Sequence, residues 1–281
     1  MLAACDSGSG GPINIPPPPS PRGEPTPLAQ TKLNINHIHA LAVSVNSRTV
    51  LIATHHDVRL AVSGASPRPL SPGLSGDVLQ VLYGAGGAAY AAGHNLGVQV
   101  SRNGGASWAP VSRDVAGLDV HGLVADPRDL RQMIAYAVGH GILTSSDAGA
   151  HWTHRPGYAD SHYLTGLAVT ADGTLLAGSP DLGLAASPDH GATFDSVQSG
   201  TGPVYSIAAS ETSADVVVVA AENGIFLTQN GGKDWAVGVA ISGNVVTGVG
   251  VDAIDPHHLY AGDANGQVFT STDSGNSWSP L

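Results

Sequence analysis

Residues 101–108 read SRNGGASW, and the same eight-residue pattern returns four more times along the chain. Each copy begins with Ser or Thr and has Asp or Asn third, Gly fifth and an aromatic residue last. The fifth-position glycines are separated by 44, 42, 41 and 43 residues. A unit that returns at a nearly fixed period predicts a repeat architecture in which each unit packs on its neighbours. The other copies are SSDAGAHW (145–152), SPDHGATF (187–194), TQNGGKDW (228–235) and STDSGNSW (271–278).

The chemistry of this pattern is that of a hairpin turn. The Asp or Asn side chain accepts hydrogen bonds from backbone amides of its own turn, and glycine supplies a positive φ. The pattern resembles the Asp-box, or BNR, repeat. Two of the five copies carry a carboxamide instead of a carboxylate, which a turn tolerates and an acid catalyst does not. We therefore expect a structural role for Asn103, Asp147, Asp189, Asn230 and Asp273.

A short alternating apolar segment recurs with the turns and predicts a strand in every repeat. It occurs six times, and a further apolar segment lies between it and the following turn. Four short strands per repeat form one propeller blade, so the sequence predicts an all-β, six-bladed β-propeller over residues 33–281. The first blade lacks the turn pattern, and we expect Leu33–Asn36 to complete the last blade. The six segments are HALAV (39–43), LQVLY (79–83), HGLVA (121–125), TGLAV (165–169), YSIAA (205–209) and TGVGV (247–251).

The composition supports an all-β protein with many turns. Charged residues make up 12% of the 281 residues, and glycine supplies 37 of them. Lys and Arg total 11 against 22 Asp and Glu, which gives a net charge of −11. Because a net anion is repelled by phosphates, nucleic acid and anionic membrane surfaces are excluded as partners. We also expect a monomer. The 13 histidines outnumber Lys and Arg together and are the unusual feature.

The only cysteine, Cys5, follows Leu2-Ala3-Ala4, which resembles the lipobox of a bacterial lipoprotein. On this interpretation residues 1–5 are the remnant of a signal peptide and Cys5 is lipidated. Residues 6–32 are rich in Pro, Gly and Ser and predict a disordered tether. No other stretch approaches 18 apolar residues. We therefore expect an exported protein that contacts the bacterial envelope membrane only through its lipid anchor.

Histidines recur at equivalent places in the predicted blades. The loop after the second strand of each blade carries a titratable side chain, namely His55 with His56, His94, His140, Asp181, Glu222 and Asp263. The inner strands add His37, His39, His121 and Tyr205, and we expect these residues to line a ligand-binding face at one mouth of the channel. Imidazoles beside carboxylates suit transition metals, so the pattern predicts a Zn or Cu site. Its predicted ligands are His39, His56, His94 and His140.

The alternative is that these histidines are solvated or cap turns, which leaves the ligand open between a metal ion, a glycan and an envelope protein.

Two further motifs support a resemblance to a known family. The segments HIHALAV (37–43) and ATHH (53–56), together with the five turns, resemble bacterial envelope lipoproteins that are labelled glycosyl hydrolase or sialidase-like. A more distant resemblance extends to sortilin-type receptors and photosystem-assembly factors, which are Asp-box propellers that bind partners without catalysis. The sialidase-like label implies three arginines that clamp a substrate carboxylate, but no Arg follows Arg155.

We therefore expect a binding module that acts through its His/Asp/Glu-lined central face. The alternative is a glycoside hydrolase that uses two of Asp181, Glu222 and Asp263 as paired carboxylates. Sialidase activity is not expected.

Overall fold

The computed structural model describes residues 37–44, 49–62, 65–70, 74, 76–198, 201–238, 241 and 245–281. Cys5, the predicted tether at 6–32 and the predicted closing segment at 33–36 lie outside these residues. No helix within the described ranges is long and apolar enough to cross a membrane.

Six antiparallel sheets of four strands make up the fold, and in each sheet the strands pair in chain order. The first three sheets, blades 1 to 3, contain β1 (Ile38–Val43), β2 (Thr49–Thr54), β3 (Val58–Val62) and β4 (Ala65–Pro69); β5 (Val78–Tyr83), β6 (Ala89–Gly93), β7 (Gly97–Ser101) and β8 (Ala109–Pro110); and β9 (Val120–Asp126), β10 (Asp129–Ala137), β11 (Gly141–Ser145) and β12 (Thr153–Arg155). Blades 4 to 6 contain β13 (Gly166–Val169), β14 (Leu175–Ser179), β15 (Gly183–Ser187) and β16 (Asp195–Gln198); β17 (Val204–Ala209), β18 (Val216–Ala221), β19 (Gly224–Gln229) and β20 (Ala236–Val237); and β21 (Val246–Val251), β22 (Leu259–Asp263), β23 (Val268–Ser271) and β24 (Ser279–Pro280). Two single 3₁₀ turns, η1 (Ala85–Gly87) and η2 (Tyr158–Asp160), complete the regular structure of the described residues.

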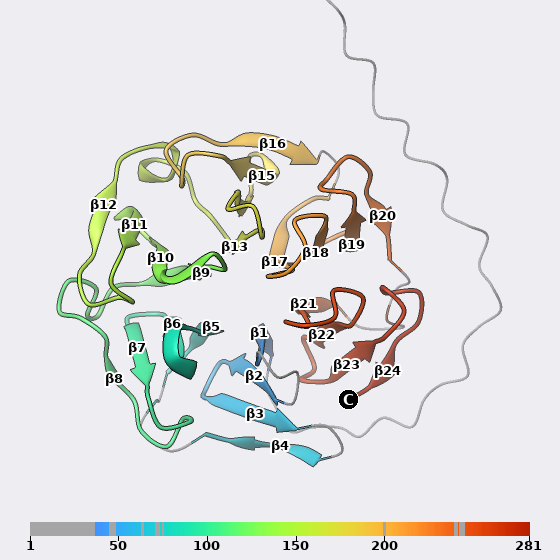
Figure 1. Cartoon of the computed structure of the whole chain (residues 1–281), viewed down its shortest axis with the longest axis horizontal. Coiled ribbons are helices and arrows are strands. Elements are labelled where there is room, and N and C mark those ends of the chain that lie inside the picture. The colour runs from blue at the N-terminus through green and yellow to red at the C-terminus, as the bar shows by residue number, and fades with distance from the viewer. Residues whose placement is uncertain are drawn as a thin grey trace, which may run out of the picture.

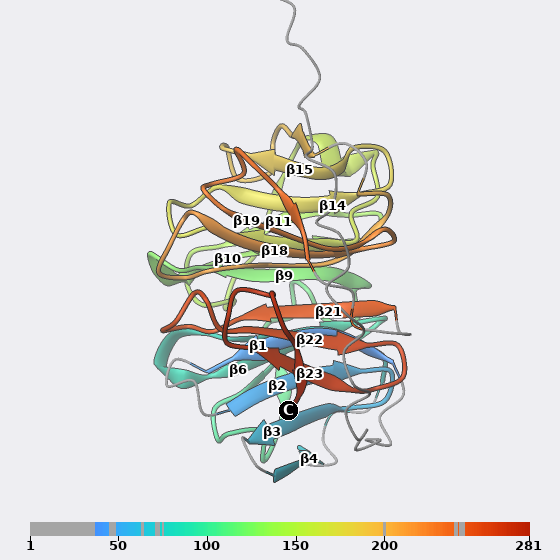
Figure 2. The same cartoon turned by 90° about the vertical axis from the view of Figure 1, so that its right-hand side faces the viewer.

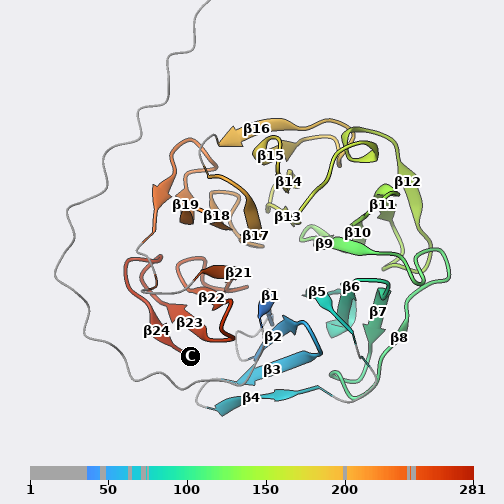
Figure 3. The same cartoon turned by 180° about the vertical axis from the view of Figure 1, so that it is seen from behind.

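The six sheets surround a common axis, with the first strand of each sheet innermost (Figure 1). Each innermost strand packs on that of the next blade, in the closed order β1, β5, β9, β13, β17, β21 and back to β1. Seen edge-on, the strands run between the two faces of the ring (Figure 2), and the view from behind shows the same closed ring (Figure 3). The predicted all-β, six-bladed β-propeller is confirmed.

Blade 6 closes the ring on blade 1 by tight packing of β21 and β22 against β1. The Thr247 hydroxyl donates a hydrogen bond to the Ile38 carbonyl oxygen at 2.5 Å. A Cβ on Gly248 or Gly262 would lie 3.2 or 2.7 Å from Cγ2 of Ile38, so a side chain would crowd Ile38 at position 248 and displace it at position 262. These glycines of β21 and β22 therefore permit the approach that closes the ring.

The outer strand of blade 6 is β24, which the last residues of the chain supply. Its Ser279 pairs with Thr270 and its Pro280 with Phe269. Blade 6 thus has four strands among the described residues, and the predicted contribution of Leu33–Asn36 lies outside them. Two residues suffice because the preceding turn already sets them in register with β23, and proline is tolerated on an outermost strand.

All five repeat turns share one hydrogen-bond pattern. The first-position hydroxyl accepts the N–H of the fifth-position glycine at 2.8–3.0 Å. The third-position side-chain oxygen accepts the N–H of the seventh residue at 2.9–3.0 Å. The five glycines have φ between 78° and 94°, a region that favours glycine. The Asp and Asn side chains of the repeats are therefore engaged in their own turns.

The side chain at the seventh position restricts the choice between Asp and Asn in the turn of Asn230, whereas a seventh-position Ser occurs with Asn103 as well as with Asp273. Oδ2 of Asp273 accepts the Ser277 hydroxyl at 2.6 Å. Asn230 instead donates from Nδ2 to the Asp234 carboxylate at 2.9 Å. A carboxylate at position 230 would face another carboxylate, so the carboxamide is the group that suits this turn.

The apolar core of the described residues is divided into six clusters, each between two adjacent blades. The aromatic residue of each repeat turn packs on the cluster that its own blade shares with the preceding blade. Trp108 lies against the cluster between blades 1 and 2, and Trp278 against that between blades 5 and 6. Buried apolar area stabilises by about 25 cal/mol per Å². Each turn therefore joins two blades as well as two strands. The other aromatic residues placed in this way are Trp152, Phe194 and Trp235.

We predict opposite outcomes for Asn→Asp substitutions in two of the turns. Asn230→Asp places two carboxylates together and should lower the free energy of unfolding by about 1–2 kcal/mol. Asn103→Asp is the matched control, because its partner is the Ser107 hydroxyl at 2.8 Å, which can donate to a carboxylate. Urea unfolding at pH 7 measures both variants. Equal destabilisation of the two would contradict the proposed role of the seventh residue.

Candidate metal centre

A β-bulge recurs near the start of the innermost strands. Between Ile38 and Ala40, β1 advances two residues while β2 advances one, so His39 is the extra residue. A bulge interrupts the alternation of a strand and re-aims the extra side chain. The extra residues of the five bulged strands are His39, Leu79, His121, Tyr205 and Thr247. The structure therefore places His39, His121 and Tyr205 at equivalent positions of their blades.

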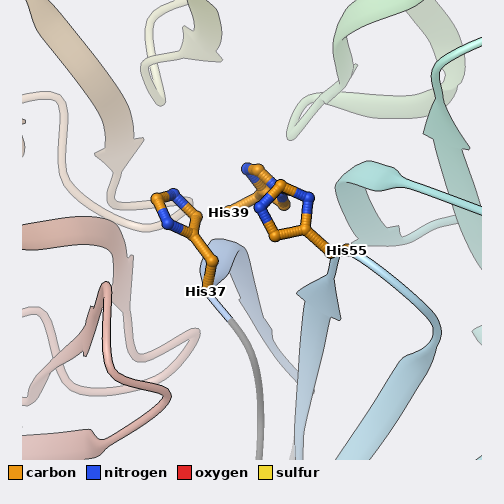
Figure 4. Close-up of side chains that lie close together, drawn as sticks. All are labelled: His37, His39 and His55. Carbon is orange, nitrogen blue, oxygen red and sulfur yellow. The ribbon is translucent and has the colours of Figure 1, made fainter.

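Three imidazoles converge at the start of β1 and the end of β2 (Figure 4). The ring centroids of His37 and His39 are 4.8 Å apart, and those of His39 and His55 are 4.5 Å apart. One nitrogen of each of the three rings lies within 4.8 Å of one nitrogen of the others. His37 has a φ of 40°, an uncommon backbone conformation for a residue with a side chain. These three histidines form the first ligand group.

Asp77, directly before β5, joins this group from blade 2. Its Oδ1 lies 3.1 Å from Nε2 of His39 and 3.0 Å from Nδ1 of His55. Those two nitrogens are themselves 3.3 Å apart. These three contacts cannot all be hydrogen bonds at once. If both imidazoles donate an N–H group to the carboxylate oxygen, neither nitrogen keeps a lone pair to accept from the other. Around a metal ion with bonds of about 2.0–2.1 Å, adjacent ligand atoms lie about 2.9–3.4 Å apart. The three atoms therefore have the spacing of metal ligands.

His94, Asp119 and His121 form a second ligand group. Oδ1 of Asp119 lies 2.8 Å from Nδ1 of His94 and 3.0 Å from Nε2 of His121. The ligand atoms of the three residues all lie within 4.8 Å of one another. The other ring nitrogen of His121, Nδ1, is hydrogen-bonded to the Tyr163 hydroxyl at 2.6 Å. The group thus combines the β6–β7 loop with the start of β9 and receives the side chain of Tyr163, which precedes β13.

The two ligand groups are adjacent. Nε2 of His94 lies 3.6 Å from Oδ2 of Asp77, so one carboxylate contacts both groups. We call the whole set the histidine–aspartate arc. It consists of His37, His39, His55, Asp77, His94, Asp119, His121 and Tyr163. Its residues come from blades 1 to 3 and from the segment that leads into blade 4.

Burial keeps the more enclosed imidazoles of the arc neutral. It lowers the pKa of His39 to about 4, against the opposing effect of the Asp77 carboxylate. Burial is also the main cause that lowers the pKa of His37 and of His121. A neutral imidazole has a lone pair on one ring nitrogen and can bind a metal ion without first losing a proton.

The rest of the channel is lined mostly by apolar residues, with Glu211 as the one carboxylate among the described lining residues. The later halves of the six inner strands line a cavity of about 130 Å³, mostly with Ala, Leu and Val side chains. The residues of the arc precede or begin the inner strands or, for His55 and His94, follow the antiparallel second strands, so they lie at the opposite mouth of the channel from this cavity. Within the described chain the ligand-type side chains are thus concentrated at one mouth.

The structure brings together only part of the predicted ring of titratable residues. His39 and His94 belong to the two ligand groups, and so do His37, His55 and His121. His56 is exposed and its ring centroid lies 6.3 Å from that of His55. Nδ1 of His140 is hydrogen-bonded to the Val138 carbonyl of its own loop. The two ligand groups found among the described residues include neither.

The carboxylates of blades 4 to 6 also lie outside the two groups. Asp181 and Glu222 are exposed on their loops. Asp263 is buried, and its Oδ1 accepts the N–H groups of Asn265 and Gln267 at 2.9 and 2.7 Å. Its carboxylate therefore holds the β22–β23 turn, and burial raises its pKa.

Sequence reasoning missed Asp77, Asp119 and Tyr163. The two aspartates directly precede the first buried residue of an inner strand, in Asp77-Val78 and Asp119-Val120, as His37 does in His37-Ile38. An alignment of the inner-strand segments that began two residues earlier would have placed His37, Asp77 and Asp119 at the same position. Nothing local distinguishes Tyr163, because its contact with His121 joins residues 42 positions apart.

No protein-family model matches the chain, and no curated protein matches its sequence. The resemblance to envelope lipoproteins is therefore not supported by these comparisons. Solved structures do match, at identities that establish the fold alone.

Three solved structures illustrate the likeness. A protein described as a putative gluconolactonase matches with a TM-score of 0.68 and 12% identity, over 88% of this chain and 91% of that one. YCF48 from Cyanidioschyzon merolae matches with a TM-score of 0.56 and 17% identity, over 84% and 82%. The GH74 enzyme from Niastella koreensis matches with a TM-score of 0.59 and 15% identity, over 86% of this chain. This chain spans only 46% of the GH74 enzyme's length. The class of protein thereby defined is the β-propeller.

We predict that ring closure beside the arc depends on the Thr247 hydroxyl. Thr247→Val leaves the buried Ile38 carbonyl without this donor and should lower the free energy of unfolding by about 1–2 kcal/mol. Thr247→Ser keeps the hydroxyl and serves as the control. Urea unfolding compares the two variants. If Ser and Val at this position destabilise equally, the hydrogen bond is not what matters there.

Proposed function

We propose that this propeller is a metal-binding module that binds transition-metal ions, Zn²⁺ or Cu²⁺, through the histidine–aspartate arc. The carrying observation is the arrangement of His39 Nε2, His55 Nδ1 and Asp77 Oδ1, which lie 3.0–3.3 Å from one another. Imidazole nitrogen and carboxylate oxygen are ligands that both ions accept.

The electrostatics of the chain favour a cation as the ligand. The net charge is −11, and none of the eight residues of the arc is Lys or Arg. An acidic protein attracts cations to its surface, and no Lys or Arg among the arc residues competes with a metal ion for their carboxylates. The same features disfavour an anionic glycan or an acidic peptide.

The glycoside hydrolase alternative has weaker support. Asp263 is one of its three candidate carboxylates, and its Oδ1 accepts two backbone N–H groups of its own turn. The similarity to GH74 enzymes is at 15% identity and extends to the fold alone. The lipid anchor at Cys5, which would hold the module at the bacterial envelope, stays a prediction from the sequence.

We predict that the untagged protein copurifies with Zn or Cu. Elemental analysis should find the metal in the wild-type protein and find it lost from His39→Ala with His121→Ala, which removes one ligand from each group. The control is His56→Ala with His140→Ala. These two histidines lie on the equivalent loops of blades 1 and 3 and belong to neither group, so their removal should not change the metal content. A wild-type protein that neither copurifies with metal nor binds Zn²⁺ or Cu²⁺ at micromolar concentration would refute the proposal.

We also predict that metal removal destabilises the fold. At a free Zn²⁺ concentration of about 100 times Kd, each bound ion should raise the free energy of unfolding by about 2.7 kcal/mol. Thermal unfolding should therefore show a higher midpoint with Zn²⁺ than after chelation. The variant His39→Ala with His121→Ala provides the comparison, since its midpoint should not respond to Zn²⁺. An equal response of both proteins would place the binding elsewhere.

A further inference from the structure

We infer that the histidine–aspartate arc holds two metal ions in two linked centres, an inference that rests on the proposed metal-binding function. The first centre consists of His39, His55 and Asp77. The second consists of His94, Asp119 and His121. Each centre has two imidazoles and one carboxylate.

Both centres have the same local geometry. In each, a single carboxylate oxygen approaches two imidazole nitrogens, at 3.1 and 3.0 Å in the first and at 2.8 and 3.0 Å in the second. Three ligand atoms so close together occupy one side of an ion and leave its other positions open. The ligand atoms of the two groups do not form one set within 4.8 Å, so we assign the groups to two ions.

The second ring nitrogens of the second centre are also accounted for. When His94 binds an ion through Nδ1, its Nε2 carries the proton, and this nitrogen faces Oδ2 of Asp77 at 3.6 Å. When His121 binds through Nε2, its Nδ1 carries the proton, and this nitrogen contacts the Tyr163 hydroxyl at 2.6 Å. A hydrogen-bond partner at the outer nitrogen of a ligating histidine fixes the ring orientation and is typical of metal centres, and the Tyr163 hydroxyl is such a partner for His121.

Asp77 therefore has a separate role in each centre. Its Oδ1 is a ligand atom of the first centre, and its Oδ2 places negative charge 3.6 Å from Nε2 of His94 in the second, a distance beyond hydrogen bonding but within electrostatic reach. Removing this carboxylate should abolish the first centre and weaken the second. Removing only the histidines of the first centre leaves the Asp77 carboxylate beside His94 in place.

The number of bound ions tests the inference first. Metal-free protein is titrated with Zn²⁺, and bound zinc is measured by equilibrium dialysis and elemental analysis. We expect two ions per chain in the wild type and one each in His39→Ala with His55→Ala and in Asp119→Ala with His121→Ala. A single ion in the wild type overturns the two-centre inference and leaves the proposed function standing. No bound ion overturns both.

The linkage through Asp77 is tested by the remaining affinity. The Kd of the second centre for Zn²⁺ should be about 10–100 times higher in Asp77→Ala than in His39→Ala with His55→Ala. Tyr163→Phe should weaken the second centre of the wild type by about tenfold, while Tyr205→Phe, at the bulge of blade 5, should leave it unchanged. Equal Kd values in Asp77→Ala and the double histidine variant would refute the linkage.

Loading wild-type protein with two equivalents of Cu²⁺ provides a test that needs no variant. Two adjacent Cu²⁺ ions should broaden each other's electron paramagnetic resonance signal, and the signal should sharpen when only one equivalent is present. A second equivalent that leaves the line shape of the first unchanged would show that the two ions are not neighbours and would overturn the inference.

Discussion

The close packing of neighbouring innermost strands is the interaction on which the rest of the structure depends. A Cβ on Gly122 would lie 2.6 Å from Leu167 of the next blade, and one on Gly262 would lie 2.7 Å from Ile38 across the closure. These contacts let six small sheets form one ring, although among the described residues no strand pairs across two sheets. The closed ring protects the inner edge of every sheet. Because each core cluster lies between two blades, no blade depends on a core of its own.

The same packing assembles the histidine–aspartate arc. All six inner strands begin at one mouth of the channel, so residues about one repeat apart become neighbours at the start of each strand. His39, Asp77 and His121 are far apart in the sequence, yet Asp77 contacts His39 directly and reaches the group of His121 through His94. The bulges at His39 and His121 then direct these side chains out of the regular alternation and toward the mouth.

The aspartates of the repeat turns and those of the arc have different surroundings. Those of the repeat turns, such as Asp189 and Asp273, accept backbone N–H groups of their own hairpins, and hydrogen bonding holds their pKa low. Asp77 and Asp119 instead face imidazoles from neighbouring loops. The aspartates of the repeat turns are therefore structural, and the two carboxylates that suit a metal ion, Asp77 and Asp119, lie outside these turns.

The sequence by itself determined the all-β fold, the number of blades and the structure of the turns, because each of these depends on contacts within one repeat or between adjacent repeats. It also indicated that histidines gather at one mouth, since His39 and His121 recur at one blade position and His55, His94 and His140 at another. Only the tertiary structure decided which of them meet. His140 and His94 lie on equivalent loops, yet His94 has Asp119 beside it, whereas the ring of His140 turns back to the Val138 carbonyl. The physical reason is that the ligand groups form across blade boundaries, where neighbouring blades contribute different side chains to positions that look alike in each repeat.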